Sequence, residues 1–196
     1  MNRIGCTLIL ALGMSASVTA DAQSVRLRGM ITAVQADMLS VKSRAGEDLS
    51  LHLPDKVAVS VAKAIRFEDI KQGDYIGATT LKQPDGSMIA VEVHYLPKTA
   101  PQGQRLWDLQ PGSTMTNAIV SATVTSAGNR ELMLQFKGGS QKIIVPESAA
   151  LVRAVRGTRA DLKPGEYVFA IVQKRADGKL IAPRIQVSKD GVRPPQ

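Results

Sequence analysis

The sequence is poor in the residues that carry metal and redox chemistry. Its 196 residues include one Cys, two His and only 4% aromatic side chains, whereas hydrophobic residues make up 44%. A disulfide framework and a Cys-rich or His-rich metal cage are therefore excluded. The hydrophobic share is that of a globular protein, so the chain has enough apolar side chain to bury a core. In contrast, positive charge is in excess, with 25 Lys and Arg against 17 Asp and Glu.

The chain also lacks any hydrophobic run of membrane-spanning length. Its longest apolar run, residues 4–14, follows Arg3 and leads into small residues that end at Ala22. This pattern is typical of a secretory signal peptide, which is shorter than the ~20 residues of a transmembrane helix. We expect cleavage of residues 1–22 after Ala22 and a periplasmic location; an uncleaved N-terminal anchor is the alternative. Cys6 leaves with the leader, so the mature chain has no thiol chemistry.

The remainder of the chain repeats itself after 92 residues. Residues 69–95 and 161–187 are identical at ten of 27 positions without a gap, including the Asp-Gly pairs at 85–86 and 177–178. Chance would give one or two identities, so the match indicates an internal duplication. The Asp-Gly pairs predict tight hairpins, because glycine tolerates the positive φ that these turns require.

The pattern of short apolar runs predicts an all-β fold of two small barrels in tandem. A small barrel closes its sheet and avoids long exposed edges. No stretch shows a sustained helical period, and residues 60–65 and 148–156 have room for one or two helical turns at most. Pro183 stands where the first unit has Val91, which predicts that the last strand of the second unit is an edge strand or imperfectly closed there. The expected organisation is a first barrel at 23–97, a linker at 98–114, a second barrel at 115–190 and a tail at 191–196.

The linker is rich in Pro, Gly and Gln but also holds Trp107, the only Trp of the chain. A flexible spacer does not need a large aromatic side chain. We therefore expect Trp107 to dock into the seam between the two units; an exposed ring that stacks on a ligand is the alternative.

Several motifs of this chain resemble those of one family of exported bacterial proteins, catalogued as a domain of unknown function (number 5666). The motifs are Lys71 to Tyr75, Asp85 to His94, Trp107 to Leu109, Ser113 to Ala118 and Lys137 to Gly139. The resemblance covers both repeats and the linker, and it implies a tandem of OB-like β-barrels in the periplasm. It transfers no catalytic or binding residue, because none is established for that family.

Nothing in the mature chain predicts an enzyme, since a Ser or Thr nucleophile requires a positioned base. His52 and His94 are the only histidines, and strand alternation places His94 and Glu92 on the face opposite Val91 and Val93. We expect these polar residues to be solvated. The alternative is a carrier of copper, zinc or haem on the first barrel with His52, Glu92 and His94 as ligands, since imidazole and carboxylate bind such metals.

The net charge of +8 is unevenly shared between the repeats. Residues 23–97 contain nine basic and nine acidic side chains, whereas residues 115–190 contain twelve and six. A one-sided positive field attracts anions and acidic surfaces. The candidate binding residues are Arg153, Arg156, Arg159, Lys174, Arg175, Lys179 and Arg184. Because export argues against nucleic acid as the partner, we expect a non-enzymatic module without cofactor that binds an anionic envelope component or an acidic protein.

Overall fold

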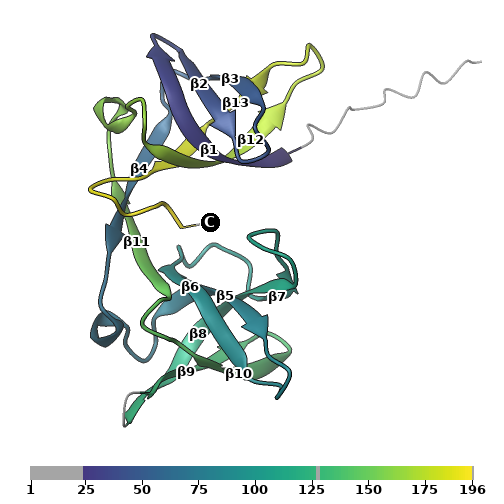
Figure 1. Cartoon of the computed structure of the whole chain (residues 1–196), viewed down its shortest axis with the longest axis vertical. Helices are drawn as coiled ribbons and strands as arrows, with labels where there is room; N and C mark the ends of the chain where they lie inside the picture. Colours follow the sequence, from purple (N-terminus) through teal and green to yellow (C-terminus); the bar gives the residue numbers. More distant parts are fainter. Residues whose placement is uncertain (1–23, 127–128, 196) are drawn as a thin grey trace, which may run out of the picture.

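The chain folds into two small β-barrels that lie one above the other and are joined along one side (Figure 1). The computed structural model describes residues 24–126 and 129–195. These residues form strands and two short 3₁₀ turns, which confirms the expected all-β class and its barrel architecture. Within the described ranges, no helix is long and apolar enough to cross a membrane.

One barrel is built from both ends of the chain, and we call it the terminal barrel. Its strands close in the order β1 (Ser24–Gln35), β2 (Met38–Ser43), β3 (Asp48–His52), β13 (Leu180–Ile181), β12 (Tyr167–Lys174) and back to β1. β14 (Arg184–Val187) extends the sheet beside β12. The core also mixes the two ends, because Ile31 and Leu51 lie in one cluster with Val168 and Ile185.

The other barrel is built from the middle of the chain, and we call it the central barrel. Its strands close in the order β8 (Ser113–Ser126), β9 (Asn129–Phe136), β10 (Gly139–Ile144), β6 (Met88–Tyr95), β5 (Tyr75–Lys82) and back to β8. β7 (Gly103–Leu106) pairs with the second edge of β8. Ile76, Val93, Val120 and Leu134 are among its fully buried core residues.

Two strands cross between the barrels. β4 (Ala58–Ala64) and β11 (Ala150–Arg156) pair with each other in antiparallel fashion, while β4 also pairs with β14 and β11 with β6. Both segments are therefore extended, and the helical turns considered at 60–65 and 148–156 do not form there. Each strand instead runs into one 3₁₀ turn, η1 (Phe67–Asp69) or η2 (Arg159–Asp161).

These crossings correct the domain boundaries expected from the repeat. Residues 23–97 and 115–190 do not each close a barrel of their own. β4 and β11 lead away from the strands that precede them, so each barrel takes β-strands from both repeats. Figure 1 shows the exchange in its colours, with purple, blue and yellow segments in the upper barrel and teal and green segments in the lower one. The expected linker at 98–114 contains β7, and the tail has buried residues, Pro194 and Pro195, between the barrels.

The two barrels match each other in hydrogen bonding. Ile31 donates its N–H to Glu166 and accepts from Gly165, at 2.9 and 2.8 Å. Val120 makes the same two bonds with Asp74 and Gly73, also at 2.9 and 2.8 Å. Both strands carry a register shift directly after this residue. Ile31 of β1 therefore corresponds to Val120 of β8, and this correspondence aligns the two barrels residue by residue.

Two local predictions are confirmed. The Asp-Gly pairs form turns in which Gly86 and Gly178 have φ of +86° and +83°, values that favour glycine. The last strand of the second repeat is broken at Pro183, because β13 ends at Ile181 and β14 begins at Arg184, whereas β6 runs without interruption.

Candidate anion-binding surfaces

The positive charge is unevenly shared between the barrels, as it is between the repeats. Residues 23–64 and 157–196, which supply the terminal barrel and its extensions, contain fourteen basic and eight acidic side chains, a net charge of +6. Residues 65–156, which supply the central barrel, contain ten and eight, a net charge of +2. The terminal barrel therefore carries most of the net charge, and the contributing side chains come from both ends of the sequence.

Three of the predicted cations lie together on the hairpin between β12 and β13. Lys174, Arg175 and Lys179 are all exposed there. Lys179 donates its backbone N–H to Asp177 at 3.1 Å and forms an ion pair with it at 3.7 Å. That backbone hydrogen bond and the nearby cations lower the pKa of the Asp177 carboxyl. Within the described residues, no ion pair involves Lys174 or Arg175, so their charges face solvent.

Arg153 and Arg156 do not share a face, although both are exposed on β11. Residues three apart in a strand point to opposite sides of the sheet. Arg153 lies over the Tyr95 ring at 4.2 Å and is paired in register with Lys63. With Lys63 and Lys71, Arg153 lines a shallow cleft of about 420 Å³. Arg184 is exposed on β14, opposite Ala58 of β4.

Arg159 has a structural role that its sequence position does not reveal. Its guanidinium donates hydrogen bonds to the backbone carbonyls of Ala36, Leu53 and Pro54, at 3.0, 3.3 and 3.0 Å. These carbonyls lie in the loops that follow β1 and β3. Arg159 therefore fixes η2 against the terminal barrel, and both of its terminal nitrogens are engaged there. The hairpin residues are the only three of the seven predicted cations that the structure brings together within the described ranges.

The predicted metal ligands lie on different barrels. His52 is on β3 of the terminal barrel, 4.0 Å from the Asp37 carboxylate, whereas Glu92 and His94 are on β6 of the central barrel. The structure does not bring the three together, and the described residues contain no group of three or more His, Cys, Asp or Glu in a metal-binding arrangement. Glu92 and His94 are also buried, at 5% and 7% exposure, which corrects the expectation that they are solvated.

Packing on the outer face of β6 explains this burial. Leu109, Val152 and residues 191–194 border a cleft beside Glu92. His94 Nδ1 lies 2.9 Å from Glu92 Oε1, so the two side chains satisfy each other. His94 fits only because its cross-strand neighbour is Gly77, where an added Cβ would come within 2.7 Å of Nε2. In the terminal barrel the corresponding pair is Phe169 and Gln186.

A cluster of arginines surrounds Trp107. The guanidinium carbons of Arg26, Arg105 and Arg28 lie 4.3, 5.1 and 5.8 Å from the centre of the half-buried indole ring. Each distance is within the range of a cation–π contact. Since β7 belongs to the central barrel and Arg26 and Arg28 belong to β1, Trp107 bridges the two barrels.

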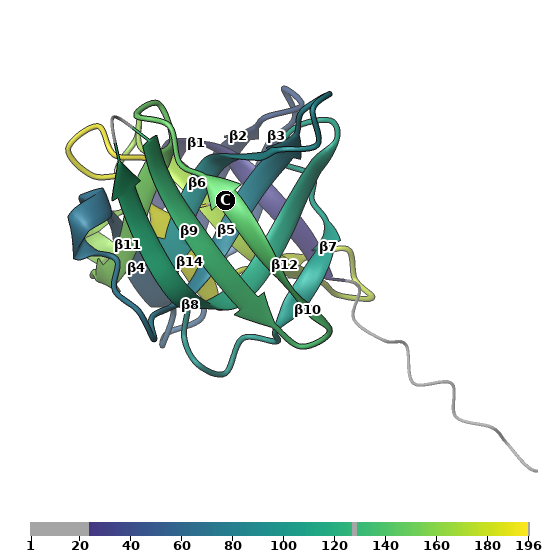
Figure 2. The same cartoon turned by 90° about the horizontal axis from the view of Figure 1, so that it is seen from below.

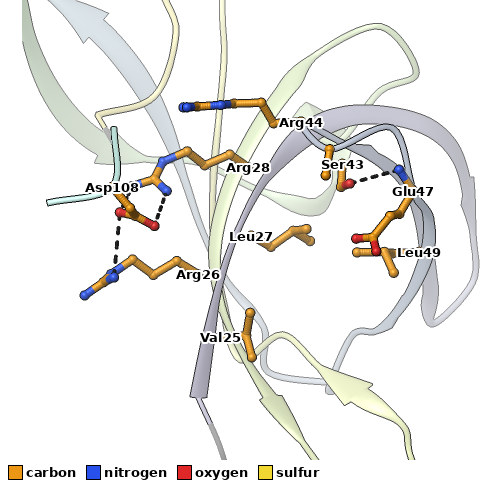
Figure 3. Close-up of a pocket in the computed structure, with 10 residues that line it drawn as sticks. Val25, Arg26, Leu27, Arg28, Ser43, Arg44, Glu47, Leu49 and Asp108 are labelled. Atoms are coloured by element: carbon orange, nitrogen blue, oxygen red, sulfur yellow. Dashed lines mark hydrogen bonds and ion pairs between the residues drawn. The ribbon is translucent and has the colours of Figure 1, made fainter. Parts of the chain in front are cut away.

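The neighbouring Asp108 holds the same arginines by charge. Arg28, which is 8% exposed, donates to both carboxylate oxygens of Asp108 at 2.9 and 3.0 Å, and Arg26 lies 3.6 Å away (Figure 3). The hydrogen bonds from Arg28 lower the pKa of the Asp108 carboxyl. Arg44 adds a bond of 2.7 Å to the carbonyl of Leu109. Charge counting along the sequence does not reveal this cluster. The sequence signal for it is the alternation of Arg26 and Arg28 with the buried Leu27 in one strand.

A cleft of about 360 Å³ opens beside this cluster, along the edge of β1. Val25, Leu27 and Leu49 supply its apolar lining. Arg26, Arg28, Arg44, Ser43, Glu47 and Asp108 supply its polar lining. Figure 3 shows Leu27 on one side of the β1 ribbon and the arginines on the other. A site of this composition offers a ligand apolar contact and the partly exposed guanidinium of Arg26.

Comparisons of the chain with models of known families, with curated proteins and with solved structures gave no match.

Proposed function

We propose that this chain is a non-enzymatic binding module of the bacterial envelope, in which the terminal barrel binds an anionic component through its phosphate groups. Export rests on the leader-like pattern of residues 1–22, which lie outside the described residues, with cleavage after Ala22 and a periplasmic location. The resemblance to the exported family of unknown function supports the same compartment. The net charge of +6 on the terminal barrel supports an anionic partner.

We also infer that the two barrels are OB-like and arose by duplication. Both close five strands in one cyclic order, with a single parallel pairing in each, β3–β13 or β10–β6. The paired hydrogen bonds of Ile31 and Val120 support a common origin. The β12–β13 hairpin and the β5–β6 hairpin are then copies of one element that have come to differ in charge.

The difference between these two hairpins carries the proposal. Lys174 corresponds to Lys82, but Arg175 and Lys179 correspond to the neutral Gln83 and Ser87. The hairpin of the terminal barrel thus has two more cations than the hairpin of the central barrel, and both lie at its exposed tip. A basic residue near an anionic membrane surface contributes about 1 kcal/mol to binding. The two additional cations are therefore worth roughly 30-fold in affinity at low salt.

The experiment moves the charges between the hairpins. Binding of the mature chain is measured by co-sedimentation with phosphatidylglycerol vesicles and with lipopolysaccharide, at low and high salt. The double variant Arg175→Gln/Lys179→Ser should bind roughly 30-fold more weakly than the unaltered chain at low salt. The difference in affinity should be smaller at high salt, because ions screen the charged contacts. The two anionic ligands distinguish a phospholipid from a glycolipid source of phosphate, and phosphatidylcholine vesicles serve as the neutral control.

A second variant controls for net charge. Adding Gln83→Arg and Ser87→Lys to the double variant restores the overall charge but places it on the central barrel. We expect no recovery of binding in this four-residue variant. Full recovery, or binding of the unaltered chain that is insensitive to salt, would contradict the proposal.

A further inference from the structure

Apart from the break at Pro183, the two barrels match strand for strand except at one position. In the central barrel, residues 114–117 of β8 are paired on both edges, with β5 on one side and β7 on the other. The corresponding residues of β1 are 25–28, given that Ile31 corresponds to Val120. They pair with β12 on one side, but the β2 ladder on the other side begins only at Gly29. Among the described residues, no strand of the terminal barrel takes the place of β7.

Backbone N–H and C=O groups at this edge of β1 point toward the place that β7 takes beside β8 in the central barrel. Ile31 makes its two backbone bonds toward the β12 side, and the direction of backbone groups alternates along a strand. The N–H and C=O of Arg26 therefore point to the opposite side, where Met115 of β8 pairs with Arg105 of β7. The C=O of Arg28 already accepts a bond of 2.8 Å from Arg44 on that side. An edge with unpaired backbone groups is a template for another strand.

The cleft beside β1 occupies this same position. Leu49, which lines the cleft, corresponds to Gln141 of the central barrel at the 92-residue offset. There the side chain of Gln104 from β7 donates to Gln141 at 2.6 Å and to Thr116 at 3.1 Å. In the central barrel β7 thus occupies the edge of β8, and Gln104 and Gln141 border a cleft of about 560 Å³ beside it; in the terminal barrel the cleft of about 360 Å³ reaches the edge of β1 itself.

We propose that residues 25–28 of β1 accept an extended peptide segment of a partner protein as an added antiparallel strand, in the way that β8 accepts β7. Strand addition of this kind takes its affinity from main-chain hydrogen bonds and its selectivity from alternate side chains. The segment carries acidic side chains, because the lining has three arginines against the two carboxylates of Glu47 and Asp108, and Arg26, 3.6 Å from Asp108, keeps 41% of its side chain exposed. Asp108 itself demonstrates how these guanidinium groups hold a carboxylate.

This site is separate from the β12–β13 hairpin that carries the proposed function, and either can fail alone. The positions that would correspond to β7 are residues 14–17, which belong to the expected leader and lie outside the described residues. The competing occupants are therefore the leader itself in an uncleaved chain and a second copy of the mature chain. Both are outcomes that the following test recognises.

The first measurement is amide hydrogen exchange of the mature chain, followed residue by residue by NMR. The probe is a short acetylated peptide in which Glu alternates with Thr and Val, and its counterpart has Lys in place of Glu. We expect the Arg26 amide to exchange rapidly in the free chain and about tenfold more slowly with the Glu peptide, which corresponds to about one hydrogen bond. The Met115 amide, which β7 covers, should be slow throughout.

The second measurement is binding of the same peptide to two variants at one position. Arg26→Pro removes the N–H that faces the cleft and leaves the ladder to β12 intact, so affinity should fall about tenfold below that of Arg26→Ala, which keeps the N–H. Thermal unfolding of both variants shows whether the barrel is retained.

Four results would overturn the proposal. They are an Arg26 amide as slow as Met115 in the free mature chain, no protection by the Glu peptide, equal binding of the Lys peptide, and protection that arises instead from self-association or from the leader of the uncleaved chain. The exchange data of the unaltered chain decide the matter even if the proline variant does not fold.

Discussion

At the scale of single residues, Asp108 is the contact that fixes the linker to the terminal barrel. Its carboxylate is held by Arg28 and Arg26, directly beside Trp107. Because the hydrogen bonds from Arg28 lower its pKa below the ordinary value of 3.8, the ionised form is favoured in the folded protein. A lowered folded-state pKa means that the stabilisation is present above the ordinary value and is lost as pH falls through the folded pKa.

This contact predicts a pH-dependent change in tryptophan fluorescence. Trp107 is the only Trp, so its emission reports the docking of the linker alone. We expect a red shift as pH falls from neutral to below 3.8, because protonated Asp108 releases the arginines and the indole becomes more exposed. Asp108→Asn should show the red-shifted emission already at neutral pH. Asp177→Asn is the matched control, since that carboxyl also has a lowered pKa but lies on the β12–β13 hairpin. An Asp108→Asn spectrum identical to that of the unaltered chain would contradict the assignment.

Arg159 and Arg153 illustrate what a residue's sequence position leaves open. The sequence correctly locates an excess of cations, but it treats all exposed arginines alike. In the structure Arg159 donates to three backbone carbonyls, and Arg153 lies over the Tyr95 ring. The carbonyls belong to loops more than a hundred residues away in sequence. Such partners depend on tertiary packing, so neither strand alternation nor charge counting reveals them.

At the scale of elements, the crossing of β4 and β11 makes a prediction about strand neighbours. Met30 of β1 pairs with Tyr167 of β12, whereas two unexchanged barrels would pair it with the equivalent Tyr75 of β5. Met30 and Tyr167 form a non-hydrogen-bonded pair of this antiparallel ladder, because the backbone groups of the next residue, Ile31, are the ones that point toward the β12 side. The Cα atoms of such a pair are about 4.5 Å apart, within the range of a disulfide.

We therefore expect a disulfide between Cys residues introduced by Met30→Cys and Tyr167→Cys in a chain of residues 23–196, which contains no other Cys. The matched pair Met30→Cys and Tyr75→Cys should remain reduced under the same oxidising conditions. Non-reducing electrophoresis after proteolysis identifies the linked fragments. A disulfide in the second pair and none in the first would show that the barrels are not exchanged.

The exchange is the part of the fold that the sequence does not predict. The Asp-Gly hairpins, the break at Pro183 and the all-β class follow from local rules, because turn residues and alternation act over a few residues. Local rules do not determine which strand pairs with β1. Because the two repeats are alike, β5 and β12 both offer a suitable edge to β1, and local sequence does not distinguish them. The extended paths of β4 and β11, which pair with each other, determine the partner, and local sequence leaves both segments open to helical turns.

At the scale of the whole molecule, the exchange changes which parts of the chain are physically independent. The central barrel is contiguous, because residues 65–156 contain all five of its strands together with β7. The terminal barrel is discontinuous, since its strands come from residues 24–52 and 167–187. Figure 2 views the molecule from below, with β8, β9 and β10 of the central barrel in front of the strands of the terminal one. A chain cut at the repeat boundary would separate partners in both barrels, whereas a fragment cut at β4 and β11 would keep one barrel whole.

This difference predicts the behaviour of two fragments. Residues 65–156 should fold alone and unfold cooperatively in urea, since every strand that closes the central barrel is present and its core includes Ile76, Val120 and Leu134. A fragment of residues 23–64 has only three of the five strands that close the terminal barrel and should show no cooperative transition. Circular dichroism and urea titration measure both. If residues 65–156 were unfolded while residues 23–97 folded as a cooperative unit, each repeat would form its own barrel. The concentration of charge on the terminal barrel would then be a property of the second repeat alone.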